Sequence, residues 1–438
     1  MKAFGKFLLT LVLLPASLLL QGQTFTSRDS LRGVYRHYDF SLEGPETPAP
    51  KGYKPFYISH YGRHGSRYPV DRDYLWNIVR TLQPVADAGL LSELGLGILD
   101  DCQRLDSICR AGVYGDLSER GALEHRTIAR NMARRWKPVF RRGGRVDVLC
   151  SYVPRCIHSM ENFTAALSEE CPRLRYSIDS SEACYAYLVN NHSVKKAPAA
   201  ARLEVEAAWD DEFWQPFYRR LFTDPEKALK LIRSRYLLCE FIYTNGSMVP
   251  LYAPDSGIDL MSVFTDEEFR TIYEAYNDKT WGGHCNSVAN GAWRIHRMDS
   301  LLISYVAEAD AAIAAYRAAP GCGSPARRMK ADAPVATLRF GHDTSLMPLL
   351  SLMGVEGFHR QLPTVGASAV FNSSIHMTMG ANLIMVFYSN RSGDVLVKFV
   401  HSGRETSIPA LTPYEGPYYR WDDVRSWFLG RVQCFSVR

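Results

Sequence analysis

The chain has 438 residues, of which 46% are hydrophobic and 22% are charged, and its formal net charge is +5. This composition is that of a globular protein, and it excludes a wholly disordered, collagen-like or coiled-coil chain. The length allows two or three domains, or one large domain with an insertion. The positive charge is too weak to indicate nucleic-acid binding, but it allows one pocket that binds a polyanion.

The first 22 residues have the layout of a cleavable signal peptide. Lys2 and Lys6 lie in the short segment that precedes an apolar run from Phe7 to Leu20, and polar residues follow this run. This run is shorter than the roughly 20 apolar residues that a membrane-spanning helix needs. We therefore expect an exported protein, either periplasmic or extracellular, with attachment to a surface as one alternative and an uncleaved anchor as another.

Ten cysteines follow, none of them before Cys102. An even number in an oxidising compartment allows disulfides, whose pairing the sequence does not define, and several of the cysteines can equally be buried thiols. The chain has no CxxC pair and no Cys/His spacing typical of metal ligands. We expect no metal and no cofactor.

Hydrophobic periodicity and capping residues predict strands that alternate with helices in the first part of the chain. Residues 24–51 are polar and end in a Pro-rich stretch, which we interpret as an extended lead-in. After it we expect a strand at 55–61, helices at 74–88 and 91–110, a helix capped by Ser118, a strand at 146–150 and a helix from Pro154 to about Glu170.

The pattern changes to a helical one, rich in aromatic residues, from about Ala186 to Pro320. It then returns to a strand at 335–340, a helix at 345–353, a hairpin of strands at 382–389 and 394–401, and a closing helix at 421–429. We expect an α/β core formed by residues 23–185 and 321–438, with a helical cap inserted at 186–320.

Three of the expected strands end in polar groups that suit phosphate. These ends are Arg63-His64-Gly65-Ser66-Arg67, Ser151-Tyr152-Val153-Pro154-Arg155 and Gly341-His342-Asp343. Ligands bind beyond the carboxyl ends of strands in open α/β sheets, so we expect the three ends to converge on one pocket. Three guanidinium groups in one pocket need an anion between them, and phosphate matches their geometry.

An imidazole among these groups can attack phosphorus and carry the phosphoryl group, with the arginines stabilising the charge on its oxygens. A carboxylic acid can protonate the departing alkoxide and later deprotonate the attacking water. This chemistry needs no metal. The sequence therefore indicates a phosphoryl-transfer site in which His64 and Asp343 are the candidate catalytic groups.

The segment Arg63-His64-Gly65-Ser66-Arg67-Tyr68-Pro69 resembles the RHGxRxP motif of the histidine acid phosphatases, the second branch of the histidine phosphatase superfamily. His342-Asp343 resembles the distal HD motif of that branch, and Arg155 resembles its middle arginine. The resemblance implies a phosphoglycerate-mutase-like three-layer α/β core with an inserted helical cap. It also implies that His64 is the nucleophile, that Arg63, Arg67, Arg155 and His342 bind the phosphate, and that Asp343 is the proton donor.

The segment RHGSRYP is similar to that of the multiple inositol polyphosphate phosphatases and phytase-like members. Those enzymes often have His-Ala-Glu where this chain has His342-Asp343-Thr344, and the Asp form is that of other histidine acid phosphatases. We expect a phosphomonoester as the small-molecule substrate, with inositol polyphosphates such as phytate preferred, and neither nucleic acid nor a stable partner. The alternatives are a broader acid phosphatase for sugar phosphates and an inactive phosphate-binding surface protein.

Other polar residues are expected to be structural or solvated. This group comprises five further histidines and a basic run: His60, His125, His158, His284, His376, Arg134-Arg135, Arg141-Arg142 and Arg145. Lys195-Lys196 lies early in the expected cap, where a polyphosphate would need additional positive charge.

Overall fold

The computed structural model of the protein describes residues 28–189, 196–318 and 333–433. The expected signal peptide, Lys195, Cys322 and Cys434 lie outside these ranges. Within them, no helix is both long and apolar enough to cross a membrane. The eight cysteines of the described ranges are all buried free thiols, as one of the two sequence interpretations allowed.

One mixed sheet of eight strands organises the described part of the chain, in the order β3-β2-β4-β1-β5-β6-β7, with β8 paired to β6. The strands are β1 (Lys54–Arg63), β2 (Gly144–Cys150), β3 (Leu174–Asp179), β4 (Pro334–Gly341), β5 (Asn382–Ser389), β6 (Val395–His401), β7 (Arg404–Thr406) and β8 (Tyr418–Arg420). β3, β2, β4 and β1 run parallel, whereas β5 is antiparallel to β1. The three strands that carry the motifs are therefore neighbours.

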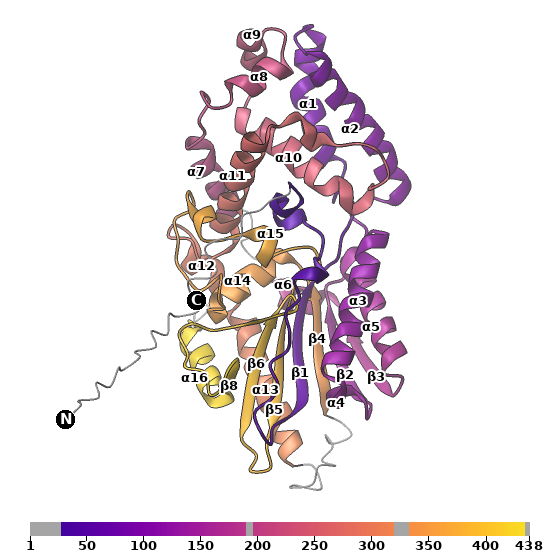
Figure 1. The fold of residues 1–438 in the computed structure, drawn as a ribbon, viewed down its shortest axis with the longest axis vertical. Coiled ribbons are helices and arrows are strands. Elements are labelled where there is room, and N and C mark those ends of the chain that lie inside the picture. Colours follow the sequence, from indigo (N-terminus) through magenta and orange to yellow (C-terminus); the bar gives the residue numbers. More distant parts are fainter. Residues whose placement is uncertain (1–27, 190–195, 319–332, 434–438) are drawn as a thin grey trace, which may run out of the picture.

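Helices cover both faces of this sheet and give three layers (Figure 1). Tyr57 and Ile58 are adjacent in β1 but belong to different core clusters, because successive side chains of a strand point to opposite faces. The cluster of Ile58 contains residues of α3 (Glu119–Arg135), α4 (Lys137–Phe140) and α5 (Pro154–Glu170). The cluster of Tyr57 contains residues of α6 (Glu182–Val189), α13 (Asp299–Arg317), α14 (Asp343–Met353) and α16 (Trp421–Arg431).

A second group of helices lies beyond the carboxyl ends of the strands, at the upper end of Figure 1. These helices are α1 (Asp73–Asp87), α2 (Glu93–Gly112), α7 (Lys196–Ala207), α8 (Gln215–Leu221), α9 (Pro225–Lys230), α10 (Arg235–Tyr252) and α11 (Asp266–His284). Two short helices, α12 (Gly291–His296) and α15 (Ser373–His376), lie between this group and the sheet.

The group of helices beyond the strand ends also includes helices that precede the expected insertion at 186–320 in the sequence. α1 and α2 contact α10 and α8 respectively, whereas α13, which falls inside the expected insertion, packs on β1. The division into a core of 23–185 and 321–438 and a cap of 186–320 stays a prediction.

Local sequence signals place the ends of several elements. Ser118 caps α3, since its side chain accepts a hydrogen bond from the amide of Gly121. Pro154 is the first residue of α5, where its missing N–H costs nothing. Gly354 ends α14 in the left-handed region, at φ 78°. β5 and β6 pair as the expected hairpin.

The N-terminal segment differs from the extended lead-in that its polar composition indicated. It forms three short 3-10 helices, Arg28–Leu31, Gly33–Tyr35 and Phe40–Leu42. The side chains of Leu31, Val34 and Tyr35 are buried, and the ring of Tyr35 lies 6.0 Å from that of Tyr276 in α11. These contacts are long-range in sequence, so the local pattern of the segment did not predict them.

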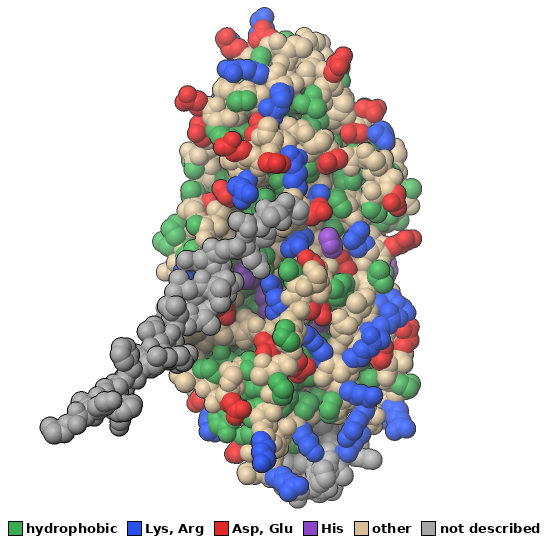
Figure 2. Space-filling model, viewed as in Figure 1, with side chains coloured by type: hydrophobic (Ala, Val, Ile, Leu, Met, Phe, Trp, Pro, Cys, Tyr) green, Lys and Arg blue, Asp and Glu red, His purple; other side chains and the backbone are tan. Residues whose placement is uncertain are grey.

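A basic flank runs over α3 and the start of β2, and Figure 2 shows Lys and Arg side chains gathered there. Arg126 and Arg130 form ion pairs with Glu169, and Arg134 forms one with Glu170. The two glutamates lie at the end of α5. Of the predicted basic run, Arg134, Arg141 and Arg142 are exposed, whereas Arg135 is partly buried and donates to the carbonyl oxygens of Gly44 and Gly403.

Candidate active site

A cavity of about 580 Å³ lies at the carboxyl ends of β1, β2 and β4. Its lining includes His64, Arg67, Arg155, His342 and Asp343, which come from all three strand ends. The register explains the convergence, because Arg63 pairs with Gly341 and Cys150 pairs with Phe340 across adjacent parallel strands. The structure thus brings the six predicted site residues together, although Arg63 does not line the cavity and reaches the site through its ion pair with Asp343.

His64 is 2% exposed and is held at its backbone by β4, since its amide donates to the carbonyl of Gly341 at 3.0 Å. Its Nδ1 lies 2.9 Å from the carbonyl oxygen of Gly65. A carbonyl oxygen only accepts, so Nδ1 carries the proton and Nε2 keeps a lone pair. Burial, and then the charges of Arg155 and Arg63, lower the pKa of His64 well below its usual value. The imidazole is therefore neutral, with a lone pair on Nε2, even in mildly acidic solution.

The loop after β1 lies directly on the first turn of α3. A Cβ on Gly65 would be 2.7 Å from the carbonyl oxygen of Gly121, and a Cβ on Gly121 would be 2.1 Å from that of Ser66. Only glycine fits at these two positions. The carboxylate of Glu124, one turn further along α3, accepts hydrogen bonds from the amide and the hydroxyl of Ser66 at 2.8 and 2.7 Å. Sequence analysis did not single out Glu124, because its partners are far away in the chain.

The three guanidinium groups have different environments. Arg63 is 1% exposed and donates to the carbonyl oxygens of Val34 and Met377 at 2.6 and 2.9 Å. Arg67 is 5% exposed and donates to the carbonyl oxygen of Tyr68 at 2.8 Å. Burial, and then Arg67, lower the pKa of Arg155. Arg67 and Arg155 therefore repel each other across the cavity, and an anion bound between them would relieve that repulsion.

His342 lines the cavity beside His64. The two rings are 5.7 Å apart and meet edge to face. Nε2 of His342 lies 3.2 Å from the hydroxyl oxygen of Ser151, and the thiol of Cys156 lies 3.7 Å from the same nitrogen. Burial, and then the charge of Arg155, lower the pKa of His342 to about 3. His342 is therefore neutral, with one ring nitrogen available to donate to an oxyanion.

Asp343 begins α14, and both of its carboxylate oxygens have partners. Oδ1 accepts from the amide of Thr344 at 2.8 Å, and Oδ2 lies 2.7 Å from Nη2 of Arg63. Burial acts to raise the pKa of Asp343, but the opposing charge of Arg63 leaves it below its usual value. The carboxyl group is thus ionised in the free protein and must gain a proton before it can donate one.

The cavity lining also contains residues that sequence analysis did not assign to the site. Tyr35 comes from the N-terminal segment, Arg202 from α7, and Lys279 and His284 from α11. Their spacing along the chain carries no motif, so nothing in the sequence alone brought them together. The sequence interpretation of His284 as a structural or surface residue stays a prediction, and the structure places this residue in the lining of the cavity.

No group of three or more His, Cys, Asp or Glu residues that could hold a metal ion occurs within residues 28–189, 196–318 and 333–433. The positively charged side chains in the lining of the cavity are those of Arg67, Arg155, Arg202 and Lys279.

The fold is that of the histidine acid phosphatases, in agreement with the sequence motifs. The Bifidobacterium longum multiple inositol polyphosphate phosphatase, in complex with inositol hexasulfate, superposes with a TM-score of 0.71 at 17% identity, over 93% of this chain and 99% of that one. The phytase from D. castellii gives 0.68 at 14% identity, over 94% and 90%. The Hafnia alvei phytase in complex with tartrate gives 0.53 at 12% identity, over 88% and 99%. No family model and no curated protein sequence matched the chain.

Proposed function

We propose that the protein is an exported histidine acid phosphatase that hydrolyses phosphomonoesters through a phosphohistidine intermediate, with inositol polyphosphates such as phytate as preferred substrates. The observation that carries this proposal is the state of His64. Its Nδ1 is held by the carbonyl of Gly65, its ring is neutral, and it lines the same cavity as two guanidinium groups. Export rests on the sequence of residues 1–22.

In the first step, Nε2 of His64 attacks phosphorus and the ester P–O bond breaks. Arg67, Arg155 and His342 donate hydrogen bonds to the non-bridging oxygens, where the negative charge is spread. Arg63, which does not line the cavity, adds its positive charge to this stabilisation. The departing alkoxide takes a proton from the carboxylic acid of Asp343.

In the second step, a water molecule attacks the phosphohistidine and the P–N bond breaks. The carboxylate that the first step left on Asp343 accepts a proton from this water. Inorganic phosphate leaves, and His64 returns to its neutral form with the proton still on Nδ1, where Gly65 accepts it.

Two features of the cavity favour a polyphosphorylated substrate. Its volume of about 580 Å³ is several times what one phosphoryl group fills. Arg202 and Lys279 line it on the helical side, away from the strand ends. Lys279 is paired with Glu240, whereas Arg202 has no carboxylate partner among the described residues. A second phosphate on the substrate would meet this guanidinium.

The test is the release of phosphate from phytate, glucose 1-phosphate and p-nitrophenyl phosphate without added metal. We expect the highest kcat/KM for phytate, and an acid-labile phosphoenzyme in rapid-quench samples. His64→Ala should lower turnover at least about a thousandfold. A variant that kept more than a tenth of the wild-type kcat would contradict the mechanism. A preference for glucose 1-phosphate would favour the broader phosphatase, and an inert wild-type protein would favour a phosphate-binding role.

Arg202→Ala tests the polyphosphate preference separately. We expect kcat/KM for phytate to fall about 10-fold or more, because a charge-assisted hydrogen bond is lost, and that for p-nitrophenyl phosphate to change less than about twofold. Arg219→Ala is the matched control, since it removes one exposed guanidinium from the neighbouring helix α8, outside the cavity. Equal effects of the two variants on phytate would show only a general loss of positive charge.

A further inference from the structure

One face of α11 is turned to the cavity. Tyr276, Thr280 and His284 line it, and they are spaced four residues apart, so they form a stripe along the helix. His284 is the last residue of the helix. It therefore lies at the end of the stripe, where α11 meets the elements around the strand ends.

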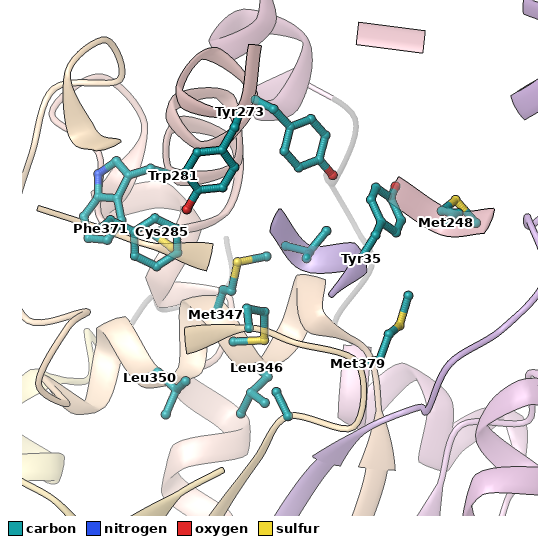
Figure 3. Packing of buried hydrophobic residues seen from close by; sticks show 14 of the residues in the cluster. Tyr35, Met248, Tyr273, Trp281, Cys285, Leu346, Met347, Leu350, Phe371 and Met379 are labelled. Carbon is teal, nitrogen blue, oxygen red and sulfur yellow. The ribbon is translucent and has the colours of Figure 1, made fainter. Parts of the chain in front are cut away.

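The packing of α11 on α14 fixes this end of the helix. Trp281 and Cys285 are fully buried, and Figure 3 shows them in the same cluster of side chains as Leu346 and Met347 of α14. Because α14 begins at Asp343, this packing also holds the last turn of α11 beside the first turn of α14.

The hydrogen bond to His284 defines which of its nitrogens carries the proton. Nη2 of Arg294, a fully buried residue of α12, lies 2.9 Å from Nδ1 of His284. A guanidinium only donates, so Nδ1 accepts and the proton of the neutral ring is on Nε2. Burial, and then Arg294, lower the pKa of His284 to about 3, although Asp343 acts in the opposite direction. His284 is consequently neutral.

We propose that His284 is a substrate-binding residue whose Nε2–H donates a hydrogen bond to an oxygen of the leaving group, next to Asp343, and that the site thereby selects polyol phosphates. The inference rests on the proposed function and deepens it. Arg294 is the positioning residue, since its donor fixes the tautomer of the ring.

The placement of the two sets of residues gives the reason for assigning His284 to the leaving group. The groups that would bind the reacting phosphoryl, including His64 and His342, all follow strands of the sheet. His284 comes from the end of α11, which packs beside the start of α14, where Asp343 lies. A substrate whose phosphoryl group faces His64 and whose leaving-group oxygen faces Asp343 therefore places its next atoms beside His284. A phosphorylated polyol offers hydroxyl and phosphate oxygens to an N–H donor there, whereas a nitrophenyl group offers only the weakly accepting oxygens of its nitro group.

The kinetic test compares His284→Ala on phytate and on p-nitrophenyl phosphate. We expect kcat/KM for phytate to fall about 10- to 100-fold, as for the loss of a hydrogen bond to a charged group, and that for p-nitrophenyl phosphate to change less than about twofold. His284→Gln should recover most of the loss, since its amide can accept from Arg294 and donate to the substrate. His359→Ala, a partly exposed histidine outside the cavity, is the control.

Equal losses on the two substrates, an unchanged phytate rate, or a His284→Gln variant no better than His284→Ala would each overturn the proposal. A readout that needs no turnover is ¹⁵N NMR of histidine-labelled protein, assigned by the loss of one ring in His284→Ala. We expect a neutral ring protonated on Nε2, and a proton on Nδ1 would overturn the inference.

If the wild-type protein hydrolyses neither substrate, the proposed function fails but His284 can still be tested by calorimetry. His284→Ala should then bind phytate about 10-fold more weakly while its affinity for orthophosphate stays unchanged. Equal changes for both ligands, or none for phytate, would overturn the assignment.

Discussion

Replacing Asp343 by Asn separates the two roles that this carboxyl group can have. The substitution keeps the shape of the side chain and an oxygen that can accept from the amide of Thr344. It removes the charge that lies 2.7 Å from Arg63 and the only proton that the proposed mechanism gives to the leaving group. The consequences for stability and for catalysis can therefore be worked out one by one.

The loss of stability should be limited. Arg63 keeps two backbone acceptors, the carbonyl oxygens of Val34 and Met377, and the amide oxygen of Asn can replace one hydrogen bond. We expect the free energy of unfolding to fall by about 1–3 kcal/mol, less than for a buried ion pair that loses one partner entirely. Phosphate should stabilise the variant more than the wild type, because the anion no longer faces a carboxylate.

The loss of catalysis should depend on the leaving group. An inositol alkoxide is a poor leaving group and needs a proton as the P–O bond breaks, so its cleavage should slow about 10²- to 10⁴-fold. A nitrophenolate is stable without a proton, and formation of the phosphoenzyme from p-nitrophenyl phosphate should slow less than about 10-fold.

Single-turnover rapid-quench kinetics with both substrates is the appropriate assay, because slow dephosphorylation can mask the first step in the steady state. His64→Ala, which cannot form the phosphoenzyme, gives the baseline. Equal losses in the bond-breaking step for phytate and for p-nitrophenyl phosphate would refute the reasoning. Asp343 would then be structural, and the proton would have to come from another carboxylate near the cavity.

Three further predictions follow from the site. Glu124→Ala should lower the free energy of unfolding by about 3 kcal/mol or more, measured in urea, because the amide and hydroxyl of Ser66 and the amide of Tyr38 lose their buried acceptor, whereas Glu124→Gln should cost less. Activity should be unchanged in EDTA, since guanidinium groups supply the positive charge, and loss that an added divalent ion restores would contradict this. The kcat/KM for phytate should show no acid limb centred near pH 6.5, because the pKa of His64 in the free protein lies well below its usual value, and an acid limb at that pH would contradict this.

The parts of the fold that could be predicted from sequence are those fixed by local rules. Ser118 begins a helix, Pro154 begins another and Gly354 ends a third, each for a backbone reason that acts within a few residues. The convergence of the motifs was also predictable, because the carboxyl ends of adjacent parallel strands lie at one edge of a sheet. The RHG and HD segments follow two such strands, β1 and β4.

The parts that could not be predicted depend on contacts between distant segments. Tyr35 and Val34 reach the site from a stretch whose polar composition indicated an extended lead-in. Glu124 has an ordinary place on an amphipathic helix, and only the fold brings it against Ser66. His284 has no motif, and its role depends on Arg294, which belongs to a separate short helix. In each case the decisive partner is set by tertiary packing.

The ion pair between Arg63 and Asp343 gives the site a link between phosphate binding and protonation. In the free protein Arg63 holds the carboxyl group in its ionised form, in which it cannot act as an acid. A phosphate bound in the cavity places negative charge beside Asp343 and also interacts with the guanidinium of Arg63. Both effects raise the pKa of the carboxyl group. By linkage, a proton on Asp343 strengthens phosphate binding to the same extent. On the proposed mechanism, substrate binding thus favours the protonated form of Asp343, which the leaving group requires. Because the ion pair with Arg63 keeps Asp343 ionised in the empty site, the site is suited to acidic solution.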